Sequence, residues 1–101
     1  MRVRLSKRSE TDLEEIGDYI ALDSPMNAVR FLGELREGCL KIGQMPAAYR
    51  QRPELGQGLR SSALKNYTLF FVIEDDEVLV VRVLHGARDI TATDFESEGS
   101  T

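Results

Sequence analysis

The sequence predicts an α+β fold with two layers, in which a pair of helices packs on an antiparallel sheet. Apolar residues recur at helical spacing through the first half of the chain. They alternate with polar residues, or run continuously, through the last third, as strands require. A loop that contains proline and glycine divides these two regions. The predicted order of elements is therefore β-α-α-β-β-β.

The first strand and the first helix are predicted within residues 2–23. Residues 2–5 alternate polar and apolar side chains, which indicates a short strand. Ser6 or Ser9 can cap the helix that follows, and this helix ends near Asp23. Steps of three and four residues place its apolar side chains on one stripe: Leu13, Ile16 and Ile20.

The second helix begins at Ser24 and Pro25, because serine is a favoured N-cap and proline is tolerated at the first helical position. Pro46 ends it. The apolar residues between these points step by four and three: Ala28, Leu32, Leu35, Cys39 and Ile42. Because about one turn of chain joins the two amphipathic helices, we expect them to form an αα-hairpin.

A loop and three further strands are predicted after the helices. Two prolines and two glycines indicate a loop over residues 46–58. Apolar and β-branched residues predict strands over 59–65, 67–73 and 78–85. The acidic residues 74–77 connect the last two strands, which indicates a polar hairpin turn.

Residues 1–90 are expected to form one domain, followed by an acidic, flexible tail over residues 91–101. The chain has a net charge of −4, of which the tail contributes −3 through Asp94, Glu96 and Glu98. Proteins that bind nucleic acid directly usually carry a surplus of basic side chains, because neutralisation of phosphates drives their affinity. We therefore expect no sequence-specific DNA binding by this chain alone.

The composition excludes several other classes of function. Cys39 is the single cysteine, so the sequence offers neither an intramolecular disulfide nor a Cys/His cluster for a metal. Gly56, Gly58 and Gly86 fit no phosphate-binding fingerprint. No stretch approaches the roughly 20 apolar residues of a membrane span, and the N-terminus lacks the apolar segment of a signal peptide. We expect a cytoplasmic protein without a cofactor, which acts by binding other macromolecules.

Both faces of the predicted sheet are apolar, because successive side chains on a strand point to opposite faces. Two helices can cover only one of these faces. The face expected to stay open consists of Phe70, Val72, Val78, Val80, Arg82 and Leu84. An exposed apolar patch of this kind indicates a site that binds a partner. The alternative is that the loop over 46–58 and the tail fold over it.

Arg82 interrupts the apolar face that it shares with Val80 and Leu84. A buried guanidinium group needs a carboxylate partner, because an uncompensated charge is costly away from water. The sequence leaves two sources of this carboxylate open. One is an acidic residue of a binding partner, and the other is an Asp or Glu of the chain itself.

Four segments carry a more specific pattern: Asp12-Leu13-Glu14-Glu15-Ile16 with Tyr19-Ile20, Leu59-Arg60-Ser61, Tyr67 with the apolar strand that it begins, and Val81-Arg82-Val83-Leu84-His85-Gly86-Ala87-Arg88-Asp89. Together they resemble the ParE branch of the RelE/ParE toxins, the toxin halves of bacterial type II toxin–antitoxin pairs. The resemblance runs from about Val3 to Ile90, and the last segment is its most specific part.

This resemblance implies a helix hairpin on an antiparallel sheet, which agrees with the fold already predicted. It also implies a ParD-like antitoxin as partner, a ribbon-helix-helix dimer whose C-terminal tail wraps the toxin and would cover the second sheet face. The implied target is DNA gyrase, whereas RelE-like relatives cut mRNA at the ribosome. The acidic charge of this chain departs from the family, whose members are often basic.

His85 is the single histidine of the chain, so any acid–base chemistry based on imidazole depends on it. In a RelE-like ribonuclease it would act as general acid or base, with Arg60 and Arg88 stabilising the phosphoryl transition state. Otherwise it is a strand-end histidine bonded to backbone. Arg88 can pair with Asp89 or touch the target, and the candidates for target binding are Arg60, Arg82 and Arg88.

We therefore expect a non-enzymatic toxin that inhibits gyrase. Two alternatives stay open: a ribosome-dependent mRNA endonuclease, and a toxin fold that binds its antitoxin but is not toxic. The endonuclease would need a basic RNA-binding surface, and residues 1–90 carry no surplus of basic side chains.

Overall fold

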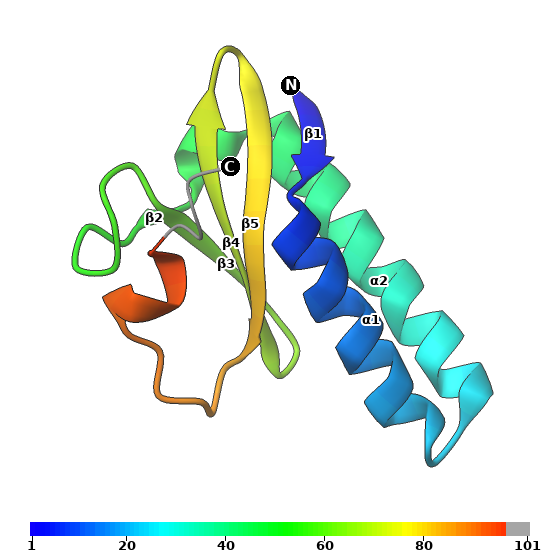
Figure 1. The fold of residues 1–101 in the computed structure, drawn as a ribbon. Helices are drawn as coiled ribbons and strands as arrows, with labels where there is room; N and C mark the ends of the chain where they lie inside the picture. The colour runs from blue at the N-terminus through cyan, green and yellow to red at the C-terminus, as the bar shows by residue number, and fades with distance from the viewer. Residues whose placement is uncertain (97–101) are drawn as a thin grey trace.

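The computed structural model describes residues 1–96 and contains two helices packed on a five-stranded sheet (Figure 1). In chain order the elements are β1 (Arg2–Leu5), α1 (Lys7–Ala21), α2 (Pro25–Gln44), the short 3₁₀ helix η1 (Pro46–Ala48), β2 (Arg50–Gln51), β3 (Arg60–Leu64), β4 (Tyr67–Glu74), β5 (Glu77–His85) and the 3₁₀ helix η2 (Ala92–Phe95). The predicted α+β class and the helix hairpin are confirmed.

The strands lie in the order β1-β5-β4-β3-β2. β1 is parallel to β5, so the sheet is mixed and the predicted wholly antiparallel sheet was wrong at this edge. β2 is a fifth strand inside the predicted loop, paired antiparallel to the start of β3. The helices cover one side of the sheet, whereas the loop between β2 and β3 and the η2 helix lie on the other (Figure 1).

Serine residues cap both helices. Ser6 caps α1, because its Oγ accepts a hydrogen bond from the backbone N–H of Ser9 at 3.0 Å. Ser9 is buried and donates its own hydroxyl to the Ser6 carbonyl at 2.8 Å, which decides between the two predicted caps. Ser24 caps α2 in the same way through Asn27, with proline next in the chain.

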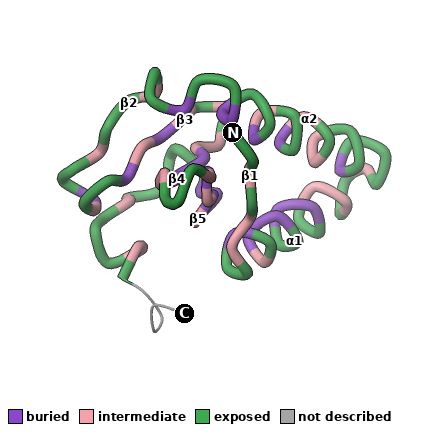
Figure 2. Tube along the Cα trace, turned by 90° about the horizontal axis from the view of Figure 1, so that it is seen from above, coloured by how far each residue is buried: buried purple, intermediate pink, exposed green. Residues whose placement is uncertain are grey.

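The main core lies between the two helices and the sheet face that they cover (Figure 2). Cys39 belongs to it, and burial raises the pKa of its thiol to about 11, although nearby Arg36 acts in the opposite direction. A thiol held in its protonated form is a poor nucleophile, so Cys39 is a packing residue. The buried members of this core are Leu13, Ile16, Leu35, Cys39, Ile42, Leu69, Phe71, Val78, Val80 and Val83.

A β-bulge in β5 changes which residues face the helices. Phe70 pairs with Arg82 and Phe71 pairs with Val80, so Val81 is an extra residue that has no partner in the register. Strict alternation had placed Val78 and Val80 on the second face of the sheet. That assignment was wrong, because these two residues are fully buried beneath the helices.

Candidate functional site

The second face of the sheet is partly covered by the chain itself. Phe70 and Leu84 pack with Leu55 and Leu59 of the loop between β2 and β3 in a separate buried cluster. The ring of Phe95 from η2 stacks edge-on against Phe70, with 4.8 Å between the ring centroids. The expectation of an open face was therefore wrong for Phe70 and Leu84, and the alternative in which loop and tail fold over them is correct.

The first part of the predicted flexible tail is an ordered helix. Residues 92–95 form η2, and the capping box of Thr91 and Asp94 closes its first turn, with the Thr91 N–H donating to Asp94 Oδ2 at 2.9 Å. The cap and the packed Phe95 hold this segment on the sheet. The remainder of the tail, residues 97–101, lies outside the described residues.

A groove of about 670 Å³ remains open on this face. Its apolar floor contains the half-buried side chains of Val72, Leu79 and Val81. One wall is the start of α1 with Lys7 and Arg8, and the other walls are η2 and the loop over residues 55–59. An apolar floor with a charged wall is the arrangement expected for a site that binds a segment of another protein.

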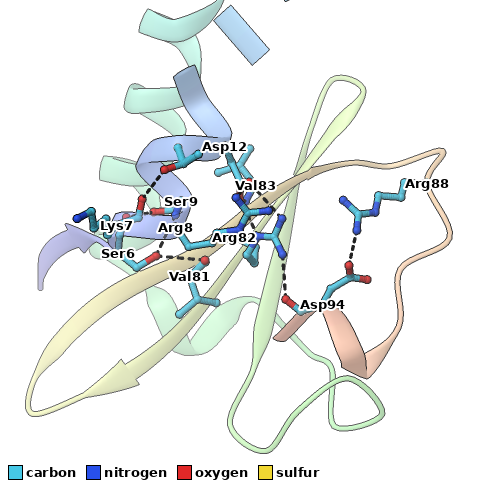
Figure 3. A network of polar contacts seen from close by, with 11 residues as sticks. Ser6, Lys7, Arg8, Ser9, Asp12, Val81, Arg82, Val83, Arg88 and Asp94 are labelled. Atoms are coloured by element: carbon cyan, nitrogen blue, oxygen red, sulfur yellow. Dashed lines mark hydrogen bonds and ion pairs between the residues drawn. The ribbon is translucent and has the colours of Figure 1, made fainter. Parts of the chain in front are cut away.

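Arg82 lies at the edge of this groove, in the polar network shown in Figure 3. Its Nε and Nη2 donate to the two carboxylate oxygens of Asp12 at 2.9 and 3.2 Å, and its Nη1 donates to the Asp94 carbonyl at 3.0 Å. Both side chains of the ion pair are buried. The carboxylate that Arg82 requires is thus internal, so a partner's acidic residue is not needed and Arg82 is a poor candidate for target binding.

Asp12 also completes the exposed edge of β5. β1 pairs only with residues 77–80, so the rest of this edge lacks a neighbouring strand. Asp12 Oδ2 accepts the Val83 N–H at 2.9 Å, and Ser6 Oγ donates to the Val81 carbonyl at 3.2 Å (Figure 3). The side chains of Ser6 and Asp12 therefore take the place of a missing strand and tie the start of α1 to β5, and Arg82 links β5 to η2.

His85 and Arg88 lie near each other around a small cavity of about 250 Å³ beside α1. The Nδ1 of His85 accepts a hydrogen bond from the Ala87 N–H at 3.1 Å, and its ring packs edge-on against Tyr67. Arg88 forms an ion pair with Asp94 rather than with the adjacent Asp89. These contacts are those of a histidine and an arginine that fix the end of the sheet.

Arg60 is not part of this cavity. Its Nη1 donates to the carbonyls of Ala47 and Tyr49 at 3.3 and 2.8 Å, so it anchors the chain around η1. In the register of β4, Arg60 lies opposite Phe71 whereas His85 lies opposite Tyr67. Four residues of strand separate these positions, which corresponds to about 13 Å. The structure therefore does not bring the three predicted ribonuclease residues together.

Tyr67 and Tyr19 add phenol groups to the small cavity. Burial, and to a smaller extent the nearby Tyr19, raises the pKa of Tyr67, so its hydroxyl stays protonated near neutral pH and cannot replace histidine as a base. Within residues 1–96 no group of three His, Cys, Asp or Glu side chains could hold a metal ion. Over the same residues, no helix is long and apolar enough to span a membrane.

The sequence model of the ParE toxin of type II toxin–antitoxin systems matches residues 3–90. The chain belongs to the ParE toxin family. This match covers both helices and every strand except the first residue of β1, and therefore includes the groove floor and the Asp12–Arg82 pair. The family match by itself identifies neither the antitoxin nor the target of this ParE-family toxin.

Solved structures from toxin–antitoxin systems share the fold of this ParE-family toxin. A chain of the chromosomal ParDE system from P. aeruginosa superposes with a TM-score of 0.74 at 22% identity, covering 84% of this chain and 95% of that chain. A chain of the RelBE2 toxin–antitoxin complex from Mycobacterium tuberculosis superposes with a TM-score of 0.62 at 25% identity, covering 83% and 95%. Comparison with curated proteins finds no match.

Sequence reasoning missed several residues that shape the site of this ParE-family toxin. Asp12 precedes Ile16 by four residues, so it lies on the buried side of α1, and an acid in that position is a signal for an internal partner. Leu79 and Val81 were not among the residues predicted for the open face, because alternation across β5 gave no sign of the bulge. Lys7 and Arg8 gain their place in the groove wall only from the tertiary fold.

Proposed function

We propose that this ParE-family toxin inhibits DNA gyrase in the cytoplasm and is neutralised by a ParD-like antitoxin. The observation that carries the proposal is the match of the ParE family model over residues 3–90. The proposed action is non-enzymatic: the toxin binds gyrase, and DNA that the enzyme has cleaved accumulates. The antitoxin is a ribbon-helix-helix protein whose C-terminal segment wraps the toxin.

The groove is the proposed seat of that antitoxin segment. Its floor supplies apolar surface from Val72, Leu79 and Val81, which are half-buried and can still gain from further burial. Lys7 and Arg8 on its wall favour acidic side chains in the segment that binds there. Of the six residues predicted to bind the antitoxin, Val72 keeps an open apolar surface in this groove.

The arrangement of His85, Arg60 and Arg88 weighs against the ribonuclease alternative. General acid–base catalysis requires the base within hydrogen-bond reach of the reacting hydroxyl, and transition-state charge requires a cation beside it. Arg60 is anchored to backbone carbonyls around η1, and Arg88 is paired with Asp94. A third possibility, a toxin fold without toxicity, has the same groove and differs only in its effect on cells.

We expect the His85→Ala variant to arrest bacterial growth as strongly as the unmodified toxin. His85 holds the Ala87 N–H at the end of β5, and gyrase inhibition needs no proton transfer. A ribonuclease that used His85 as its acid or base would lose roughly 10²–10⁴-fold in rate. Growth after induction, with and without co-expressed antitoxin, measures the effect. A variant that still co-purifies with antitoxin but no longer arrests growth would contradict the proposal.

A further inference from the structure

The outer side of α2 carries a stripe of exposed apolar residues. Met26, Val29 and Leu40 are 71%, 73% and 66% exposed, although α2 is a 20-residue helix whose other side packs in the core. Gly33 lies between them and is also exposed. With 3.6 residues per turn, these four positions fall within roughly 60° of one another around the helix axis. They lie along the side of α2 that faces away from the core, with the exposed Arg36 and Glu37 in the turn between Gly33 and Leu40.

No contact within the described chain requires a glycine at position 33. A Cβ at Gly17 would lie 2.9 Å from Leu32, and a Cβ at Gly43 would lie 2.6 Å from the Met1 carbonyl, so both glycines allow close packing. A Cβ at Gly33 would meet nothing within 4 Å. An exposed glycine inside a helix destabilises it by about 1 kcal/mol relative to alanine. Its use at the centre of an apolar stripe indicates close approach of another backbone.

Two opposite charges flank the stripe on one edge. Arg30 precedes Gly33 by three residues and Glu37 follows it by four, and both side chains are exposed. Arg30 donates to Asn27 Oδ1 at 3.3 Å, and Glu37 takes part in no ion pair within residues 1–96. On an isolated chain seven residues separate these two charges, which is about 10 Å along the helix and too far for them to meet.

We propose that this stripe is a dimerisation surface, on which α2 of a second copy crosses antiparallel at Gly33. A two-fold axis near Gly33 places Met26 of each copy beside Leu40 of the other, because the two residues lie seven positions before and after it. The same axis brings Arg30 of each copy beside Glu37 of the other. The surface is therefore self-complementary in both shape and charge, as a two-fold interface requires.

A second copy suits this surface better than an unrelated helix. Met26 and Leu40 exchange places about the axis, Gly33 lies near it, and Arg30 exchanges with Glu37, a pattern that a heterologous partner would not demand. The groove is bordered by the start of α1 but by no residue of α2, so a dimer through the outer side of α2 leaves it open. The inference goes beyond the proposed function, because a toxin of either target class could dimerise through α2. One pair of helices buries a small area, so a weak dimer is expected.

Sedimentation velocity on the full chain tests the proposal, over a range from about 1 µM to about 1 mM that covers weak association. We expect a concentration-dependent monomer–dimer equilibrium. Glu37→Arg places like charges together at two symmetry-related positions and should raise the Kd roughly 10-fold. The double variant Arg30→Glu with Glu37→Arg restores opposite charges and should restore the dimer. Glu14→Arg, an exposed acid of α1, is the matched control and should leave the Kd unchanged.

Gly33→Ala gives a second test, because it should stabilise the monomer and weaken the dimer. The dilute monomer should unfold at a higher temperature, since alanine favours the helix and has open space around it. The dimer should weaken, since the added Cβ separates the crossing helices. A chain that stays monomeric at every concentration overturns the proposal. So does a double charge variant that fails to restore association, or a Gly33→Ala variant that dimerises as well as the parent.

Discussion

Replacing Asp12 by Ala should lower the free energy of unfolding by about 3–5 kcal/mol. Asp12 is 3% exposed and forms two hydrogen bonds to the guanidinium group of Arg82. Its removal leaves that charge buried without its carboxylate and also removes the acceptor of the Val83 N–H. A domain of this size has about 5–15 kcal/mol of stability in total, so this single change should remove a large part of it.

Urea denaturation followed by circular dichroism measures the loss, with the midpoint and the m-value fitted separately. Glu14→Ala is the matched control, because Glu14 is an exposed acid two positions further along α1. The double variant Asp12→Leu with Arg82→Met removes both charges and should recover part of the loss. It should stay about 1–3 kcal/mol below the parent, because the Val83 N–H still lacks an acceptor. A loss below about 1 kcal/mol for Asp12→Ala would show that the buried pair is not a major support of the fold.

Leu79→Asp should weaken antitoxin binding at least 100-fold, a change of about 2.7 kcal/mol or more. The half-buried side chain of Leu79 lies in the groove floor, where a bound apolar segment would remove the new carboxylate from water. Phe70 and Val80 are unsuitable for this test, because both are fully buried in the cores of the chain itself. Charged substitutions at those two positions would report on folding instead of binding.

Calorimetric titration with the antitoxin measures the effect of Leu79→Asp, and thermal unfolding of the free variant shows that it still folds. Leu22→Asp makes the same chemical change at an 84% exposed position in the turn between the helices. This control should bind as tightly as the unmodified chain. Unchanged affinity in a folded Leu79→Asp variant would show that the antitoxin does not use the groove.

The helices could be predicted from the sequence because their signals are local. Ser24 and Pro25 mark the start of α2, and the apolar residues that follow keep one spacing up to Pro46. The strands of the β4–β5 hairpin were found for the same reason. By contrast, the parallel pairing of β1 with β5 joins residues 2–5 to residues 77–80, and no local pattern records it.

The candidate site was less predictable, because it depends on one irregularity and on long-range contacts. The extra residue Val81 interrupts the alternation of side chains along β5. Strict alternation from the end of the strand therefore assigns Val78 and Val80 to the wrong side of the sheet. The carboxylate for Arg82 comes from a residue 70 positions away. The need for that carboxylate followed from the chemistry of a buried guanidinium, but its identity required the tertiary structure.

The most direct test of the proposed function adds the purified chain to gyrase with plasmid and ATP, and in parallel to translating ribosomes with mRNA. We expect loss of supercoiling with accumulation of linear plasmid, while the mRNA stays intact. Leu22→Asp serves as a control that should act like the unmodified chain. Cleaved mRNA with normal supercoiling would contradict the proposed function and favour the ribonuclease, and a lack of effect in both assays would contradict it in favour of a toxin fold without toxicity.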